Sequence, residues 1–388
     1  MRLLFVKDAL VWPRSSGHDV HTFYMMKACA DLGHEVSLAT VTEPTPEALE
    51  GLPLACRWRL DAPVAGDTTT AGTWIQRRFR SFWGVSEIQI ENLRRVVADW
   101  HPHALIVVGL DALPYFPAIS GPVRIWYAAD EWALHHLSQL RPTIASWREH
   151  LYAAAVKWVY ERAHRRDVDR VWVVSRSDQR AMRWLAGMRH VDVLPNGVDG
   201  DFFRPGDGNP DDQSAVFWGR LDFGPNIQAL EWFCRRVWPR VRREAPDARF
   251  TIIGFNPGEA VRSLASRDGI SLVADLDDLR DAARRHAVAA LPFVSGAGIK
   301  NKLLEAAALG LPIVCTPTAA RGLRGQNPPL DLATTPAAFA AALLAIWADA
   351  ARRRAQGVAV RAWVVKHHTW AATAREAMRP LELGVQCR

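Results

Sequence analysis

The stretch VAALPFVSGAGIKNKLLEAAALGLPIVC, residues 288–315, decides the fold. Its apolar run Val288–Leu291 predicts a strand, and Ile313–Cys315 predicts a second one. Between them lie a glycine-containing loop and a helix that we predict over Lys302–Leu309. A strand, a helix and another strand in this order make a βαβ unit, which is typical of a mainly parallel sheet.

The same alternation extends outward from this unit in both directions. The other predicted strands are Leu3–Val6, Val36–Thr40, Leu105–Val108, Val123–Trp126, Val171–Val174, Val191–Leu194, Ala215–Trp218, Phe250–Ile253 and Ile270–Val273. The other predicted helices are Val20–Leu32, Glu87–Asp99, Trp147–Arg165, Ser177–Ala186, Ile227–Arg243, Glu259–Ser266 and Pro336–Trp347. The pattern therefore predicts an α/β protein with doubly wound sheets.

A break near residue 200 divides the alternation into two parts. Pro195-Asn196-Gly197 is a turn signal, and residues 204–212 are dense in proline, glycine, asparagine and aspartate. We predict an N-terminal domain at residues 1–198, a C-terminal domain at 199–368, and a terminal helix at 369–388. Ligands of such sheets bind beyond the carboxyl ends of the strands, so two domains suggest a cleft between them.

Composition places the chain among ordinary globular proteins. Of its 388 residues 49% are hydrophobic and 23% charged, which excludes a disordered or fibrous chain. Five cysteines without a CxxC pair favour a reducing compartment. The apolar run after Arg2 ends at Lys7, too early for a signal peptide. The histidines show no metal-binding spacing, so no metal site is predicted. A cytoplasmic protein is expected.

The basic charge balance leaves two interpretations open. The net charge is +7, and no nucleic-acid-binding motif accompanies it, so no nucleic-acid partner is expected. The arginines either solvate helix faces or form a surface for anionic lipid or a phosphorylated substrate. Seventeen tryptophans are present, and Trp147, Tyr152, Trp158 and Tyr160 share one predicted helix. That helix either packs in the core or makes a peripheral contact with the inner face of the membrane.

Three segments carry groups that suit a phosphorylated ligand. Gly17 ends a small-residue loop before a helix, where backbone N–H groups can meet a phosphate, although a plain turn looks the same. The segment at residues 294–305 adds glycines, Lys300 and Lys302 at the start of a helix that contains Glu305. Arg220, at the end of a strand, can bind a phosphate with two hydrogen bonds or pair with Asp222.

Together these segments resemble the retaining nucleotide-sugar glycosyltransferases of family 4, which have the GT-B fold. The matching motifs are "GHEV" at 33–36, "VS" at 174–175, "LPNGVD" at 194–199 with Phe203, "GR" at 219–220, and "GIKNKLLEA" at 298–306 with "GLP" at 310–312. The match runs nearly end to end. It implies two Rossmann-like domains that face each other across a cleft, and transfer of a sugar from a nucleotide diphosphate sugar.

The resemblance also implies roles for particular residues. Glu305 would hold the ribose hydroxyls, Arg220 and Lys302 would neutralise the diphosphate, and the backbone from Val273 would face the nucleobase. The remaining donor-binding positions are Gly17, Gly298, Ile299, Lys300 and Asn301. Cationic side chains and helix dipoles would replace a metal ion, so neither metal nor cofactor is expected. The terminal helix would return to the first domain.

Departures from the family pattern keep a second hypothesis open. Ala297 stands where members often carry a second glutamate, and Pro225-Asn226 stands where a lysine usually follows the "GR" arginine. Asp130, after a predicted strand, is our catalytic candidate from the first domain, although it also suits a helix N-cap. A glycan, a lipid-linked intermediate or a small molecule would accept the sugar. The alternative is a pseudo-glycosyltransferase that binds without transfer; an NAD-dependent oxidoreductase is disfavoured because no glycine fingerprint follows a strand.

Overall fold

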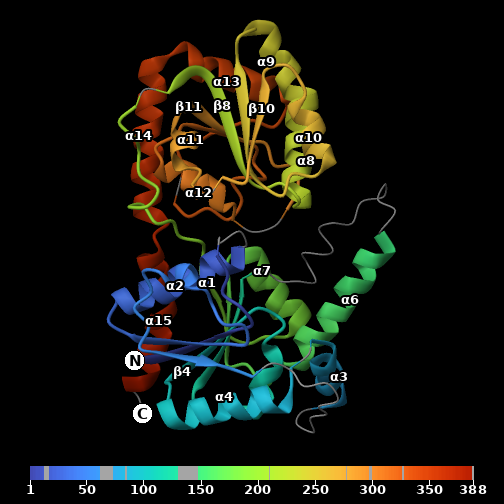
Figure 1. Cartoon of the computed structure of the whole chain (residues 1–388), viewed down its shortest axis with the longest axis vertical. Coiled ribbons are helices and arrows are strands. Elements are labelled where there is room, and N and C mark those ends of the chain that lie inside the picture. The colour runs from blue at the N-terminus through green and yellow to red at the C-terminus, as the bar shows by residue number, and fades with distance from the viewer. Residues whose placement is uncertain are drawn as a thin grey trace. The chain divides into compact units, whose positions relative to one another are not determined.

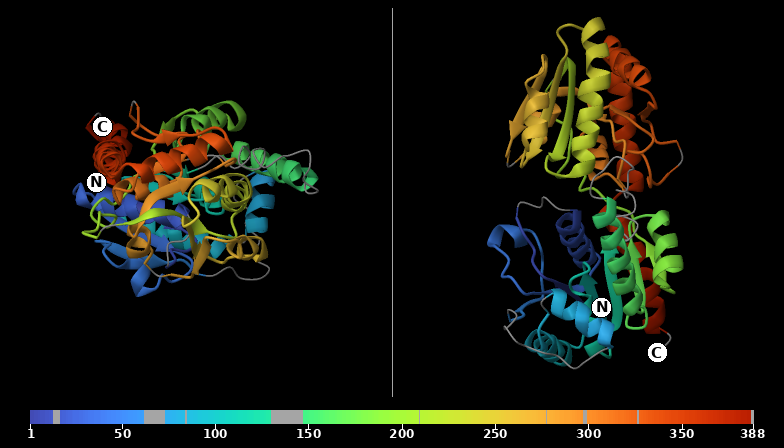
Figure 2. Two further views of the ribbon diagram at one scale, coloured as in Figure 1. Left: turned by 90° about the horizontal axis from the view of Figure 1, so that it is seen from above. Right: turned by 90° about the vertical axis from the view of Figure 1, so that its right-hand side faces the viewer.

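The computed structural model describes residues 1–12, 17–61, 73–83, 85–129, 147–208, 210–276, 278–296, 299–325 and 327–386. The chain divides into two compact units. Unit 1 contains residues 1–194 together with the chain from Thr373 onward, and unit 2 contains Pro195–Ala372. Figures 1 and 2 show that each unit has one sheet flanked by helices.

Unit 1 contains a parallel sheet in the order β3-β2-β1-β4-β5-β6-β7. Its strands are β1 (Arg2–Lys7), β2 (Glu35–Thr40), β3 (Cys56–Arg59), β4 (Ala104–Val108), β5 (Val123–Ala129), β6 (Arg170–Val173) and β7 (Val191–Val193). Its helices are α1 (Gly17–Asp31), α2 (Pro46–Leu49), α3 (Trp74–Trp83), α4 (Glu87–Trp100), α6 (Trp147–Ala163) and α7 (Arg176–Ala181), with the 3₁₀-helix η1 (Leu113–Ala118) and the π-helix η2 (Met182–Ala186).

Apolar strands and capped helices explain why these elements form. The side chains of Leu4, Val6, Leu105 and Val107 on the two central strands are fully buried in one cluster. Helix α4 begins with a capping box, in which the Ser86 hydroxyl accepts from Gln89 N–H and the Gln89 side chain accepts from Ser86 N–H. Both signals are local, and both elements were predicted.

Unit 2 contains a parallel sheet in the order β10-β9-β8-β11-β12-β13. Its strands are β8 (Asp211–Arg220), β9 (Arg249–Phe255), β10 (Ile270–Ala274), β11 (His286–Leu291), β12 (Ile313–Cys315) and β13 (Asp331–Leu332). Its helices are α8 (Gly224–Trp232), π-helix η3 (Phe233–Val237), α9 (Trp238–Glu244), α10 (Glu259–Ala265), α11 (Arg280–Arg284), α12 (Asn301–Ala308), α13 (Pro336–Ala348) and α14 (Ala350–His367). Helix α15 (Trp370–Gln386) begins in unit 2 and continues into unit 1.

The secondary structure differs from the prediction at several elements. The turn-rich stretch predicted over residues 204–212 ends earlier, because β8 already begins at Asp211. Strand β3 was missed because its arginines alternate with half-buried residues along an edge strand. Helix α14 was missed although Asp349 caps it by accepting from Ala351 N–H and Arg352 N–H. None of the helices in the described ranges is long and apolar enough to cross a membrane.

The turn at Pro195-Asn196-Gly197 lies against the end of α14. A Cβ atom on Gly197 would lie 2.5 Å from the backbone nitrogen of Trp370, so no side chain fits there. Val198 N–H donates to the His368 carbonyl at 2.8 Å. The His368 ring accepts from Arg324 N–H at 2.9 Å and lies 3.2 Å from the Asn196 carbonyl. Burial lowers the pKa of His368 to about 4, so the ring is neutral at pH 7.

Candidate functional site

The candidate site of unit 2 lies where the strand order reverses. Strands β8 and β11 are neighbours, and the chain leaves their carboxyl ends toward opposite sides of the sheet. Trp218, Gly219 and Arg220 end β8, while the loop after Leu291 leads into α12. The carboxyl ends of parallel strands at such a reversal form the usual ligand site of doubly wound sheets.

Lys302 is held in the first turn of α12 by groups from three other segments. Its Nζ donates to Asn226 Oδ1 at 2.8 Å and lies 4.7 Å and 5.1 Å from the ring centroids of Phe217 and Phe293. The residue keeps some surface exposure, but its charge sits among these groups. Burial is the main cause that lowers the pKa of Lys302 to about 7; the Glu305 charge opposes this shift and the Lys300 charge adds to it.

Gly219 leaves the space that the Lys302 ammonium group fills. A Cβ atom on Gly219 would lie 2.5 Å from Lys302 Nζ and 3.2 Å from Asn226 Nδ2. The φ angle of Gly219 is +143°, which side chains rarely adopt. A Cβ atom on Gly254, its neighbour in β9, would meet the Gly219 carbonyl. The two glycines therefore bring backbone and cation together at the strand ends.

Glu305 lies one helical turn after Lys302. Its Oε2 accepts a hydrogen bond from Trp218 Nε1 at 2.7 Å, which joins α12 to the end of β8. Burial raises the pKa of the Glu305 carboxyl, whereas the Trp218 hydrogen bond and the Lys302 charge oppose the rise. A carboxylate and a cation thus project from the same turn of one helix toward the same strand.

Arg220 forms an ion pair with Asp222, which the sequence offered as the alternative to phosphate binding. Its Nε and one terminal nitrogen donate to the two oxygens of Asp222 at 3.0 Å and 2.8 Å. The Arg220 side chain remains 42% exposed, and the pair lowers the pKa of Asp222. Asn226 Nδ2 donates to the Arg220 carbonyl at 2.6 Å. Asn226 therefore joins the backbone of Arg220 to the ammonium group of Lys302.

The other predicted donor-binding residues lie at the same edge of the sheet or just beyond it. Lys300 precedes α12, with its Nζ 5.5 Å from the Phe293 ring centroid. Asn301 accepts from Asn196 Nδ2 through its side-chain oxygen. Ile299 is buried, and Val273 pairs with Ile253 near the end of β10.

Gly17, Asp130 and Gly298, three further predicted site residues, are not part of this cluster. Gly17 begins α1 in unit 1. Asp130, the catalytic candidate, and Gly298 lie outside the described residues, as does Ala297. The structure thus brings together Lys302, Glu305 and the backbone of Arg220, but it assigns no place to Asp130.

Comparisons with known proteins agree with this geometry. The family model described as Glycosyltransferase Family 4 matches residues 15–202, and the model described as Glycosyl transferases group 1 matches residues 212–349. The two adjoining models account for most of the chain. The chain belongs to the group 1 glycosyltransferases. No protein of curated function matches this glycosyltransferase in sequence.

Solved structures confirm the predicted GT-B fold class of two Rossmann-like parallel-sheet domains. Sucrose-phosphate synthase from Thermosynechococcus elongatus has a TM-score of 0.72 and 15% identity, with all of both chains covered. A glycosyltransferase from Rickettsia africae has a TM-score of 0.68 and 11% identity, with 98% of this chain and 97% of the other covered. The Anabaena protein HepE, in complex with UDP and glucose, has a TM-score of 0.65 and 13% identity over 98% and 99% of the two chains.

Unit 1 of the glycosyltransferase contains a second polar cluster that sequence analysis missed. It lies at the carboxyl ends of β1 and β4, where the strand order of that sheet reverses. Lys7 pairs with the buried Asp19 at 2.8 Å. A Cβ atom on Gly109 would lie 2.7 Å from Asp111 Oδ1 and 3.9 Å from His18 Nδ1. Burial lowers the pKa of His18 to about 4 and raises the pKa of Asp111.

Sequence analysis also missed two residues of unit 2 that contact the predicted site, namely Asn226, which binds Lys302, and Trp218, which binds Glu305. Trp218 ends a predicted strand and Asn226 stands at a departure from the family pattern, yet nothing local indicates which charged groups they contact. Asn226 accepts a hydrogen bond from Lys302 in this glycosyltransferase. The departure from the expected family pattern at Pro225-Asn226 was the one signal in the sequence that pointed to this contact.

Proposed function

We propose that this glycosyltransferase moves a sugar from a nucleotide diphosphate sugar to an acceptor hydroxyl, with retention of the anomeric configuration. The observation that carries the proposal is the turn of α12 that presents Lys302 and Glu305 to the end of β8. The complex of the Anabaena protein with UDP and glucose supports a nucleoside diphosphate as the leaving group.

The donor would be held by two groups of opposite charge that lie one helical turn apart. The Glu305 carboxylate keeps acceptor capacity beyond its bond to Trp218 and would accept hydrogen bonds from the ribose hydroxyls. The Lys302 ammonium would face the diphosphate. An arriving anion raises the pKa of a neighbouring lysine, so Lys302 carries its full charge when the donor is bound.

Bond cleavage would draw on the same cations. As the glycosidic bond breaks, negative charge grows on the diphosphate oxygen, and a cation fixed nearby stabilises the transition state more than the ground state. Arg220 is paired with Asp222, and a phosphate that displaces this carboxylate can accept the same two hydrogen bonds from the guanidinium. These side chains would replace a metal ion, so the proposed transfer needs none.

On the acceptor side, the cluster at the ends of β1 and β4 in unit 1 supplies polar groups for a hydroxylated acceptor. We assign the acceptor to the glycans, lipid-linked saccharides or small hydroxylated molecules. Asp111 has a raised pKa and a neighbouring neutral histidine, His18, so it suits the handling of a hydroxyl proton. Asp130 keeps its role as the other candidate.

A binding screen followed by product analysis tests the proposal. Thermal shifts with UDP, GDP, dTDP and ADP sugars, in the presence of EDTA, should show stabilisation by one nucleotide. Turnover of that donor and NMR of the new glycosidic bond should then show the donor's anomeric configuration in the product. Stabilisation by a nucleotide without turnover of any acceptor would favour a binding protein instead, and inversion of configuration would refute the retaining mechanism.

A further inference from the structure

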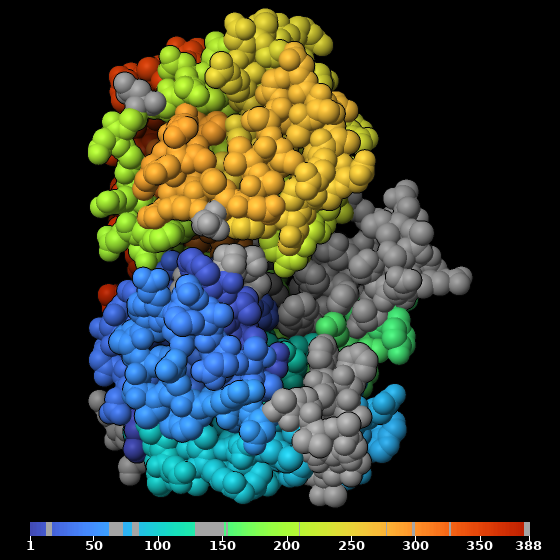
Figure 3. Space-filling view, in the orientation of Figure 1, coloured from blue at the N-terminus to red at the C-terminus, as the bar shows by residue number. Residues whose placement is uncertain are grey.

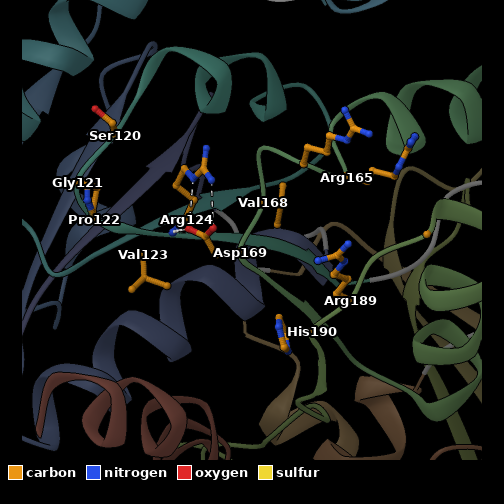
Figure 4. A pocket seen from close by; sticks show the side chains of 12 residues that line it. Ser120, Gly121, Pro122, Val123, Arg124, Arg165, Val168, Asp169, Arg189 and His190 are labelled. Atoms are coloured by element: carbon orange, nitrogen blue, oxygen red, sulfur yellow. Dashed lines mark hydrogen bonds and ion pairs between the residues drawn. The ribbon is translucent and has the colours of Figure 1, made fainter. Parts of the chain in front are cut away.

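A basic pocket lies at the amino ends of β5, β6 and β7 in unit 1, opposite to the carboxyl ends of the strands described above. It has a volume of about 1060 Å³ and is lined by the beginning of β5, the segment after α6 and the loop before β7. Four arginines line it, namely Arg124, Arg165, Arg166 and Arg189, and Asp169 is the one acidic residue among the lining residues. Figure 4 shows Arg124 against Asp169, with Arg165 and Arg189 across the pocket.

Among the residues that the structure describes, a carboxylate neutralises one of these four arginines. Arg124 donates to the two oxygens of Asp169 at 3.2 Å and 3.1 Å. Arg165 donates to the Arg162 carbonyl at 3.2 Å, which leaves its charge in place. Within the described ranges, no carboxylate pairs with Arg165, Arg166 or Arg189. Three positive charges therefore face one pocket, and an anion with several acceptor oxygens would complement them.

An exposed apolar surface borders this pocket, and we call it the α6 stripe. It consists of Leu151, Tyr152, Trp158 and Val159 on α6 and Trp184 and Leu185 on η2. The α6 members recur at helical spacing, so they share one face of the helix. Tyr152 is 73% exposed and Trp184 is 84% exposed. Figure 3 shows atoms of α6 at the surface of unit 1, beside α3.

Direct contacts join the α6 stripe to the pocket. Trp158 Nε1 donates to the Leu185 carbonyl at 2.8 Å, and Arg162 donates to the same oxygen at 3.3 Å. The Arg162 guanidinium lies 6.0 Å from the centroid of the Trp158 ring. A Cβ atom on Gly187, a pocket residue, would lie 3.5 Å from Arg162 Nη1 and 3.4 Å from Arg165 Cδ, so Arg162 links the stripe to the pocket. The aromatic and basic groups therefore form one continuous surface.

We propose that this surface docks unit 1 on an anionic membrane, with the pocket binding the phosphate of a lipid headgroup. Single exposed apolar residues are ordinary, but six neighbouring ones beside uncompensated arginines match the chemistry of the membrane interface. Aromatic side chains settle at headgroup depth, and arginines contact the lipid phosphates. The net charge of +7 supports attraction to such a surface. The proposal does not depend on the transfer reaction.

Vesicle flotation of the full-length chain tests the proposal. Wild-type protein should float with vesicles of phosphatidylcholine and phosphatidylglycerol, and not with phosphatidylcholine alone. Arg166→Glu with Arg189→Glu should weaken binding to the anionic vesicles roughly 100-fold or more, because each basic residue near the surface contributes several-fold. Tyr152→Ser with Trp184→Ser should weaken it roughly 10-fold.

A matched control distinguishes the contribution of the pocket to vesicle binding from the effect of net charge. Arg236→Glu with Arg243→Glu makes the same change of charge at exposed positions of unit 2. If this pair weakens vesicle binding as much as the pocket pair does, attraction is unspecific and the proposal is wrong. Absence of flotation with anionic vesicles would also overturn it. Stabilisation by inorganic phosphate that the pocket pair abolishes, without flotation, would identify a site for a soluble phosphate instead.

Discussion

Burial of the Lys302 ammonium group leads to a quantitative prediction about the free energy of unfolding. The pKa of Lys302 falls from 10.5 to about 7 in the folded chain. The unfolded chain therefore binds more protons between these two values, and folding stability rises with pH through that window. At pH 7 the cost of the buried ammonium is roughly 4–5 kcal/mol, and at pH 9 it is roughly 2 kcal/mol.

Lys302→Met removes this cost and one hydrogen bond. The methionine keeps the apolar stem between Phe217 and Phe293. Loss of the donor leaves Asn226 Oδ1 without its partner, which costs about 1–3 kcal/mol. At pH 7 we expect a net gain of roughly 1–4 kcal/mol. At 2–4 °C per kcal/mol this is about 2–16 °C in the melting temperature of a unit of this size. Nucleotide affinity should be lost in the same protein.

The pH dependence is the sharper part of the prediction. The cost at Asn226 does not titrate, so it cancels when the stability difference between Lys302→Met and wild type is compared at two pH values. Denaturant unfolding at pH 7 and pH 9 should show that difference shrinking by about 2–3 kcal/mol. Lys366→Met, at an exposed position of α14, is the control and should show no such change. If the stability difference between Lys302→Met and wild type is the same at both pH values, the Lys302 ammonium group is not desolvated and the reasoning is wrong.

Three further predictions concern neighbouring residues. Glu305→Gln weakens the acceptor without changing its volume, so calorimetry should show nucleoside diphosphate affinity falling by roughly 1–3 kcal/mol; unchanged affinity would make Glu305 a structural partner of Trp218 only. Asp222→Ala releases Arg220 and removes a negative charge, so affinity should rise up to about 5-fold, and a fall would show that the ion pair orients the guanidinium. Gly219→Ala places a Cβ atom 2.5 Å from the ammonium group at a φ of +143°, and should cost about 1–3 kcal/mol in unfolding experiments; wild-type stability would contradict the strain.

Most of the fold could be predicted because its signals are local. Apolar runs of four or five residues mark the central strands, and the Ser86 capping box marks the start of α4. The missed elements carry weaker local signals and depend on tertiary contacts. Strand β3 carries Arg57 and Arg59 on its exposed face, and its pairing with β2 supplies the order that its own residues do not indicate. Helix α14 carries three arginines near its start, and its buried residues Val360, Trp363 and Val364 lie only in its second half, so its packing against α12 was not predicted.

The site could be predicted as a set of residues but not as a set of contacts. Lys302 and Asn226 are 76 positions apart, and Trp218 and Glu305 are 87 apart. Which of them meet depends on the register of β8 beside β11 and on the angle at which α12 leaves the sheet. Those quantities are set by the packing of the whole unit. Motifs therefore identified the chemistry, while the arrangement of charges needed three dimensions.

The arrangement itself is an argument for function, because it opposes stability at several neighbouring positions. A lysine loses its hydration, a carboxyl with a raised pKa lies one turn away, and Gly219 adopts a φ of +143° beside them. A sequence selected for stability alone would fill this end of β8 and β11 with apolar side chains, as it does along the strands themselves. Local features that disagree with the fold concentrate at sites that do chemistry. In unit 2 they concentrate at the strand reversal, where an arriving diphosphate would supply the negative charge that the buried lysine needs.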